Sequence, residues 1–175
     1  HDDKNTNSIA SKAVYVTQSM GDGTILIGTY QGLDLMNIGT GIFKHHVYNP
    51  VDSGSINANR ITCIKKDRSG NIWVGTTKGL NRFDQRTGKF FNGLDVNGSA
   101  IFFIFEDSRS NVWVGSYRSG LYLYNKQSKT FSAFNDSTGL INNNMLVRGM
   151  TEDSVHLLWL NTDIGLIRLS PNTKN

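Results

Sequence analysis

Three aspartates recur at matching places in the sequence and are the first candidates for acid–base chemistry. Asp67, Asp107 and Asp153 each stand six residues before a tryptophan. A positioned carboxylate can act as a general acid or base. A catalytic group has no reason to recur at a fixed place, whereas an Asp that hydrogen-bonds its own turn does. We therefore interpret the three carboxylates as turn-stabilising residues and expect no catalysis from them.

The segment from Asp67 to Trp73 also resembles the Asp-box of sialidase-type propellers, which raises the question of glycoside hydrolysis. The spacing from Asp to Trp is one residue longer here than in that motif. The sialidase arginine cluster is not identifiable, and no pair of carboxylates can be placed on either side of a glycosidic bond. A propeller lyase or glycoside hydrolase is therefore the least favoured alternative.

The four histidines do not form a pattern of metal ligands. His45 and His46 are adjacent in an expected strand, where neighbouring side chains point to opposite faces. His1 stands at the first position and His156 in an expected turn, so no ligand cluster forms. We expect the His45–His46 pair on a solvent-exposed outer strand, and no metal.

The single cysteine, Cys63, excludes an internal disulfide bond. It lies in the apolar stretch 61–64, which predicts a buried, unreactive thiol. The chain contains no Ser/His/Asp set, P-loop or dinucleotide fingerprint. We therefore expect no catalytic residue and no cofactor.

The three aspartates belong to a longer repeat. Each copy ends in a Gly-Leu pair, and the glycines of these pairs are 47, 41 and 45 residues apart. Such periods are typical of propeller blades, which are too small to fold alone. The glycines are Gly32, Gly79, Gly120 and Gly165.

Each repeat divides into four short strands, shown most clearly by the second copy. The expected strands are 60–65, 72–76, 80–84 and 89–94, separated by turns rich in Gly, Asp and Asn. No segment shows the apolar spacing of a helix. We predict an all-β propeller fragment of about four four-stranded antiparallel blades, with the last one incomplete. The expected limits are an N-terminal segment 1–12 and blades 13–59, 60–99, 100–145 and 146–175.

The second strand of each copy carries residues that suit packing between sheets. A tryptophan occupies its centre in three copies and Leu26 in the first, where a large side chain can fill the gap to the next sheet. A glycine follows two positions later in the first three copies and permits a close approach of backbone. In the fourth copy Asn161 replaces this glycine, which predicts a looser or differently used site.

The segment 67–84 reads DRSGNIWVGTTKGLNRFD and resembles the two-component regulator propeller repeat. The resemblance covers residues 13–169 and is strongest in the second and third copies. Such repeats form the extracytoplasmic sensor of hybrid two-component histidine kinases. The resemblance implies a ligand-sensing segment of a periplasmic, inner-membrane-anchored sensor that itself does no chemistry. The kinase and the membrane span would belong to other parts of the protein.

Composition is consistent with this class of protein. The residues are 38% hydrophobic and 18% charged, which is too apolar for a disordered chain and too polar for a membrane protein. The formal charge is +4, but Lys and Arg are scattered without the basic stripe of a nucleic-acid surface. We expect no nucleic-acid partner. The opening HDDKNTNS has no initiator Met, which suggests a mature or excised form.

An open set of blades would leave two apolar blade faces uncovered, because propellers protect their edges by closing a ring. We therefore expect a homodimer that closes a ring or stacks the open ends. A compact four-bladed ring is the alternative.

Two kinds of connection share one end of every blade: those between the second and third strands, and those that enter the next blade. Their side chains vary between blades, as expected of a recognition surface on a regular scaffold. Tyr can stack on a sugar, while amides, Arg and Asp can bind hydroxyls or carboxylates. Ordinary solvated loops are the alternative. The predicted ligand-binding residues are Tyr30, Gln31, Asn59, Arg60, Lys78, Tyr117, Arg118 and Asp163, with the amides Asn57, Asn143 and Asn144 nearby.

Arg148 is a charge within the expected strand 146–150. It points into the central channel or pairs locally. The function that the sequence favours is sensing of an oligosaccharide or another small ligand. A protein–protein interaction scaffold is the main alternative.

Overall fold

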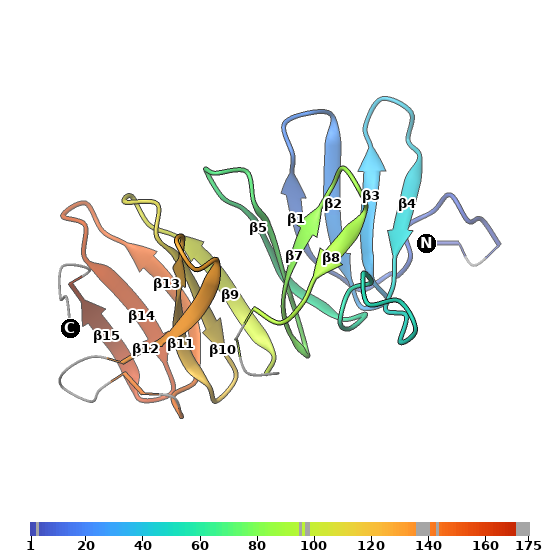
Figure 1. The fold of residues 1–175 in the computed structure, drawn as a ribbon. Coiled ribbons are helices and arrows are strands. Elements are labelled where there is room, and N and C mark those ends of the chain that lie inside the picture. Colours follow the sequence, from blue (N-terminus) through green and yellow to red (C-terminus); the bar gives the residue numbers. More distant parts are fainter. Residues whose placement is uncertain (3, 95, 97–98, 136–140, 143, 171–175) are drawn as a thin grey trace.

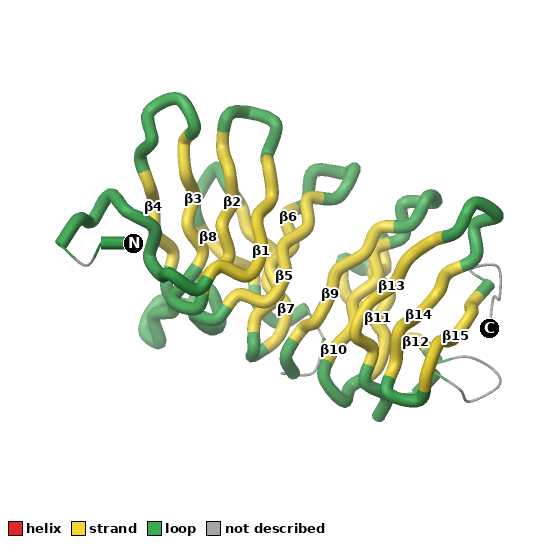
Figure 2. Tube along the Cα trace, turned by 180° about the vertical axis from the view of Figure 1, so that it is seen from behind, coloured by secondary structure: helices red, strands yellow, loops and turns green. Residues whose placement is uncertain are grey.

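The computed structural model describes residues 1–2, 4–94, 96, 99–135, 141–142 and 144–170. The strands form four antiparallel sheets that follow one another along the chain (Figure 1). None of the described residues lies in a helix, and a view from behind shows strands joined only by loops and turns (Figure 2). The all-β prediction is confirmed, and so is the incomplete last blade, because the fourth sheet has three strands within the described residues.

Each sheet is a meander in which consecutive strands pair. The first sheet contains β1 (Val14–Ser19), β2 (Thr24–Thr29), β3 (Leu33–Asn37) and β4 (Phe43–His46). The second contains β5 (Ile61–Lys66), β6 (Ile72–Thr76), β7 (Gly79–Asp84) and β8 (Lys89–Phe91). The third contains β9 (Ile101–Glu106), β10 (Val112–Ser116), β11 (Gly120–Asn125) and β12 (Thr130–Phe134). The fourth contains β13 (Val147–Glu152), β14 (Leu158–Thr162) and β15 (Gly165–Leu169).

The first strands of the four sheets lie side by side. β1 contacts β5, β5 contacts β9, and β9 contacts β13. These strands therefore line the inside of the assembly and the later strands fan outward, as in propeller blades (Figure 1). We refer to the sheets as blades one to four.

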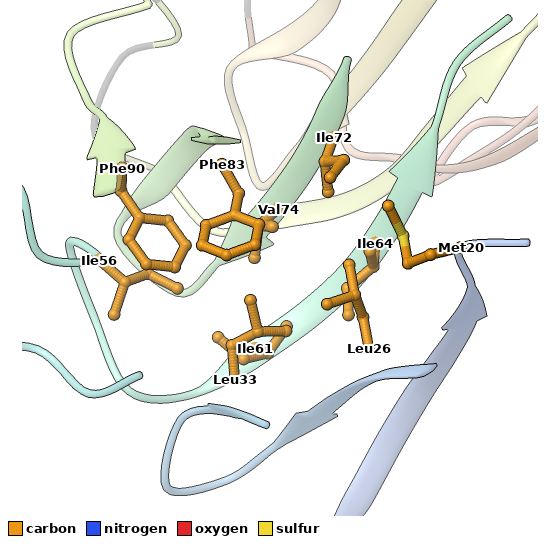
Figure 3. Close-up of a cluster of buried hydrophobic side chains, with 10 residues drawn as sticks. All are labelled: Met20, Leu26, Leu33, Ile56, Ile61, Ile64, Ile72, Val74, Phe83 and Phe90. Atoms are coloured by element: carbon orange, nitrogen blue, oxygen red, sulfur yellow. The ribbon is translucent and has the colours of Figure 1, made fainter. Parts of the chain in front are cut away.

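The core lies between blades, not within them. Between blades one and two, aliphatic side chains of β2, β3 and β5 meet two phenylalanines of β7 and β8 (Figure 3). Trp73 is buried against blade three and Trp113 against blade four. Burying one such large side chain contributes about 1.5–3 kcal/mol. Each blade is thus stable only when a neighbour covers it.

The exposed fraction of the leucine in each Gly-Leu pair shows whether a neighbouring blade covers that side of the blade. Leu33, Leu80 and Leu121 are 0%, 3% and 0% exposed, because another blade lies over each. Leu166 has the same place in blade four and is 68% exposed. The outer side of blade four therefore presents apolar surface.

Among the strands of blade two, one end differs from expectation by three residues and the others by at most one. The last strand of blade two was expected over 89–94 but ends at Phe91. Asn92 and Gly93 follow, and Gly93 has a φ of +79°, which ends the extended backbone.

The glycine at the end of the second strand makes room for a side chain of the first strand. A Cβ at Gly28 would lie 2.6 Å from both Val16 and Ile61. A Cβ at Gly75 would collide with Cys63, and one at Gly115 with Phe103. The close approach expected at this glycine is therefore present, but the atoms that approach the glycine belong to side chains and not to backbone.

Blade four differs at this place. Asn161 pairs directly with Gly149 across the strands, where Cys63 pairs with Gly75 in blade two. A Cβ at Gly149 would meet nothing within 4 Å, and Asn161 is exposed. The site is therefore open, as expected of a looser site at Asn161.

Candidate functional site: the axial face

One end of every blade is fixed by the same hydrogen bond. The backbone N–H that follows the second strand donates to the carbonyl that precedes the first strand. The pairs are Tyr30 to Ala13 at 3.0 Å, Thr77 to Arg60 at 3.3 Å, Tyr117 to Ala100 at 2.8 Å and Asp163 to Leu146 at 3.2 Å. These residues mark the end of the propeller that we call the axial face. It carries the connections predicted to bind ligand.

The innermost strand has a β-bulge where it enters the axial face. In each blade the pairing of the first and second strands skips one residue, directly after the first strand begins. Bulges re-aim side chains and are frequent near binding sites. The residues placed in this way beside the axis are Tyr15, Thr62, Phe102 and Arg148.

The first group of site residues lies over blades one and two. The Arg60 guanidinium carbon lies 5.2 Å from the ring centroid of Tyr15 and 5.8 Å from that of Tyr30. Cation–π contacts of this kind hold a guanidinium in place while its remaining N–H groups stay available. Arg60 and Tyr30, both predicted from the sequence, are therefore neighbours.

A second contact extends this group toward the outside of the blades. The Lys78 ammonium lies 5.6 Å from the ring centroid of Tyr48. The backbone N–H of Tyr48 donates to the Asn59 side chain at 2.6 Å. Asn59 and Lys78 thus meet through a tyrosine that the sequence analysis did not single out.

The second group of site residues belongs to blade three. The rings of Tyr117 and Phe102 are 5.9 Å apart and nearly perpendicular. Arg118 lies 5.4 Å from the Tyr117 ring centroid and has a φ of 51°. A left-handed conformation in a non-glycine residue is uncommon and often marks a functional position.

The remaining predicted residues stand apart from these groups. Gln31 is exposed at the end of blade one. Asp163 is exposed on blade four, where its carboxylate accepts the backbone N–H of Leu146 at 3.2 Å. Arg148 is exposed on the bulge, and within the described residues no acidic side chain pairs with it, which favours the channel over a local pair. Of the predicted binding residues, Gln31 and Asp163 therefore lie outside both groups of aromatic side chains.

The nearby amides support the connections. The Asn57 side chain donates to the carbonyl of Lys78 at 3.1 Å and accepts from Thr76 and Asn81. Asn144 donates its backbone N–H to Asn142. Asn143 lies outside the described residues.

Three site residues were missed by the sequence analysis: Tyr15, Tyr48 and Phe102. Tyr15 and Phe102 occupy the bulge position. The sequence gives no signal for the bulge position, because its residues in the four blades are a Tyr, a Thr, a Phe and an Arg, which share no residue type.

The repeated aspartates have the structural role expected of them. Asp67 accepts the indole N–H of Trp73 at 2.8 Å and the backbone N–H of Asn71 at 2.8 Å. Asp107 and Asp153 do the same for Trp113, at 3.0 Å, and Trp159, at 2.7 Å. The Trp159 hydrogen bond is the main cause that lowers the pKa of Asp153. A carboxylate held ionised by its own turn is not a general acid.

The expectation for His46 is wrong. His45 is exposed, and its ring contacts Asp34 at 2.7 Å, which raises its pKa. His46 is half-buried, with its ring 5.2 Å from Phe83 and 5.6 Å from Phe90. Burial, followed by the charge of Lys44, lowers the pKa of His46 to about 4. β4 is covered on the side of His46 because Phe83 and Phe90 of blade two pack against it.

Other candidates for reactivity are accounted for by their surroundings. Burial raises the pKa of the Cys63 thiol to about 12, as expected of an unreactive thiol. The described part of the chain contains no group of three His, Cys, Asp or Glu side chains suited to hold a metal ion. It also has no helix long and apolar enough to span a bilayer.

Comparisons with known proteins agree with the repeat and the fold. Residues 55–78 match the family described as two component regulator propeller. A protein of Formosa agariphila named histidine kinase P4 is 31% identical over 99% of this chain. The chain spans 13% of that relative's length.

Solved structures share the arrangement of blades. The extracellular domain of a putative hybrid two component system from B. thetaiotaomicron matches the whole chain with a TM-score of 0.79 and 24% identity. The chain covers 24% of that structure. A virginiamycin B lyase from Staphylococcus aureus matches 93% of the chain, and 57% of its own, with a TM-score of 0.62 and 20% identity. These likenesses concern the fold. The chain is therefore a β-propeller segment that carries the two-component regulator propeller repeat.

Proposed function

We propose that this chain is a ligand-sensing segment of the extracytoplasmic propeller of a hybrid two-component sensor kinase. The repeat and the histidine kinase relative support this class of protein. The chain contributes recognition and no chemistry, because its recurrent carboxylates serve their own turns. In this proposal the segment works in the periplasm, anchored to the inner membrane by other parts of the protein.

The axial face is the proposed ligand site, and its ligand is an oligosaccharide. The observation that carries this proposal is the bulge repeated in all four blades, which turns Tyr15 and Phe102 toward Arg60 and Tyr117. Aromatic rings offer faces for sugar C–H groups, and guanidinium and amide groups offer donors for hydroxyls or carboxylates. Binding in the full sensor shifts the packing of the blades and biases the kinase.

The test is a combined substitution on the axial face. Replacing Tyr30, Tyr117 and Arg118 with alanine removes two exposed rings and two cation–π pairs without touching the cores between blades. Isothermal titration with cellotriose, a neutral trisaccharide, compares this variant with the unaltered chain. We expect at least about a tenfold loss of affinity, since three lost contacts of about 0.5–1 kcal/mol exceed the 1.4 kcal/mol of one decade.

A matched control carries Lys4, Val155 and Arg168 as alanine. All three are exposed and lie away from the axial face. The control should bind as the unaltered chain does. If the unaltered chain and the axial variant bind the trisaccharide with equal affinity, the axial face is not the ligand site.

A further inference from the structure

The end of the propeller opposite the axial face is hollowed at blade two. A cavity of about 830 Å³ is lined by residues of β5, β6, β7 and β8 and of the turns 67–71 and 85–88. A second cavity, of about 340 Å³, lies toward blade three and is lined by Tyr124 and the turn 126–129. Asn71 and Arg82 line both cavities. The two cavities adjoin through these shared residues, and together we call them the turn-face groove.

The groove is strongly basic. Five cationic side chains line it against two carboxylates, although the whole chain has a net charge of only +4. The cations come from two strands and two turns, and they span residues 66 to 129. They are Lys66, Arg82, Arg86, Lys126 and Lys129.

The two carboxylates in the groove do not neutralise these cations. The Asp67 carboxylate accepts hydrogen bonds from the side chains of Trp73 and Asn71. Asp84 accepts the backbone N–H of Arg86 at 2.9 Å and that of Thr87 at 3.3 Å. Among the residues that the structure describes, no carboxylate lies within salt-bridge distance of a groove cation. Arg82 is held by stacking, with its guanidinium carbon 4.9 Å from the Phe91 ring centroid.

We propose that the turn-face groove binds an acidic saccharide, whose carboxylate or sulfate groups are held by Arg82, Arg86, Lys126 and Lys129. Unpaired cations grouped around a cavity attract anions, and guanidinium groups bind carboxylate and sulfate oxygens through paired N–H groups. This site is separate from the axial face and does not depend on it.

The neutral groups of the groove favour a saccharide over a nucleic acid. Asn71 and Gln85 line the cavity, and their side-chain nitrogens donate to Asp67 and Asp22. Within the described residues neither side-chain oxygen accepts a hydrogen bond, so both can accept one from a sugar hydroxyl. Phe91 is 47% exposed at the rim and offers apolar surface to a sugar ring.

The experiment measures affinity of the 175-residue chain by isothermal titration at low salt. The probes are trigalacturonate for carboxylates, a sulfated κ-carrageenan tetrasaccharide for sulfates, cellotriose as the neutral sugar and a short oligothymidylate. The groove variant carries Arg86, Lys126 and Lys129 as glutamine, all exposed and outside the blade cores. The control variant removes the same charge elsewhere through glutamine at Lys4, Lys12 and Arg168, which are also exposed.

We expect at least one acidic saccharide to bind the unaltered chain and to lose about tenfold or more in affinity with the groove variant. The affinity of the control variant should stay within about twofold of that of the unaltered chain. Which of the two acidic probes binds shows whether the groove recognises carboxylates or sulfates. The axial variant of Tyr30, Tyr117 and Arg118 should keep this binding. The inference is overturned if neither acidic saccharide binds, if the groove variant binds them unchanged, or if oligothymidylate binds more tightly than both.

Discussion

At the scale of single residues, the turn-stabilising role of the repeated aspartates was predicted from the sequence, and the structure adds a hydrogen bond from the indole N–H of each following Trp. The pair recurs at one spacing, and the turn between the two residues contains the Gly and Asn that such a turn requires. Asp67 and Trp73 lie in the same repeat, so the role of the Asp in its turn can be recognised from one repeat alone. His46 could not be predicted in this way, because Phe83 and Phe90, which cover it, come from another blade.

His46 predicts a loss of stability in acid. Its pKa is about 4 in the folded chain and 6.5 when unfolded, so the unfolded state takes up a proton first as the pH falls. The contribution of neutral His46 is complete above pH 6.5 and declines as the pH falls toward 4. Replacing His46 with leucine should abolish about 1 kcal/mol of the fall in unfolding free energy between pH 6.5 and about 5, allowing for partial exposure. Urea unfolding at each pH measures it.

His45 supplies the matched control, because its shift has the opposite sign. The hydrogen bond to Asp34 raises the pKa of His45, so its contribution is complete at low pH and is lost as the pH rises through the raised value. A His45 to glutamine variant should therefore lose stability mainly in acid. If the His46 to leucine variant keeps the full acid sensitivity of the unaltered chain, the neutral ring is not its source.

At the scale of strands, the repeat predicted which segments pair but not how regularly they pair. Glycine and apolar residues set the four strands of a blade, and these signals are local. The bulges at Tyr15 and Phe102 depend on how the innermost strands share the space around the axis. That space exists only after the blades assemble, so a single repeat carries no local sign of it.

The contrast between a crowded and an open glycine gives a prediction with its own control. Replacing Gly75 with alanine places a methyl group against Cys63 and Ile101 and should destabilise the chain by about 1–3 kcal/mol. Replacing Gly149 with alanine meets open space and should stabilise it by about 0.5–1 kcal/mol. Thermal unfolding followed by circular dichroism compares the two. Equal shifts in the same direction would contradict the role assigned to the pair.

At the scale of the whole molecule, the sequence predicted the order of blades and the uncovered side of the last one. It did not predict the turn-face groove. Lys66, Arg82 and Lys126 look scattered along the chain, and only the stacking of blades two and three brings them to one cavity. Charge clusters made from several repeats are invisible to a search for contiguous basic runs.

The uncovered side of blade four predicts self-association. Leu166 and Trp159 lie on the side that a further blade covers in blades one to three. We propose that two copies of this chain pair through it. Replacing Leu166 with serine should weaken the dimer at least about tenfold, because burial of one leucine contributes about 1.5–3 kcal/mol. Sedimentation velocity over a range of concentrations measures the association.

Val155 serves as the control for this prediction, because it is as exposed as Leu166 but lies in the turn between β13 and β14. Its replacement by serine should leave the dimer unchanged. A monomer at every concentration for the unaltered chain would refute the pairing.

The two arrangements of glycine in the blades also restrict how such repeats can diverge. A side chain at Gly75 or Gly115 would collide with the residue that stands opposite on the first strand. In blade four Asn161 replaces this glycine, pairs with Gly149 and is exposed. Duplicated blades are therefore expected to keep the glycine of the second strand wherever a side chain stands opposite it, and to accept a larger residue where the opposite position is glycine.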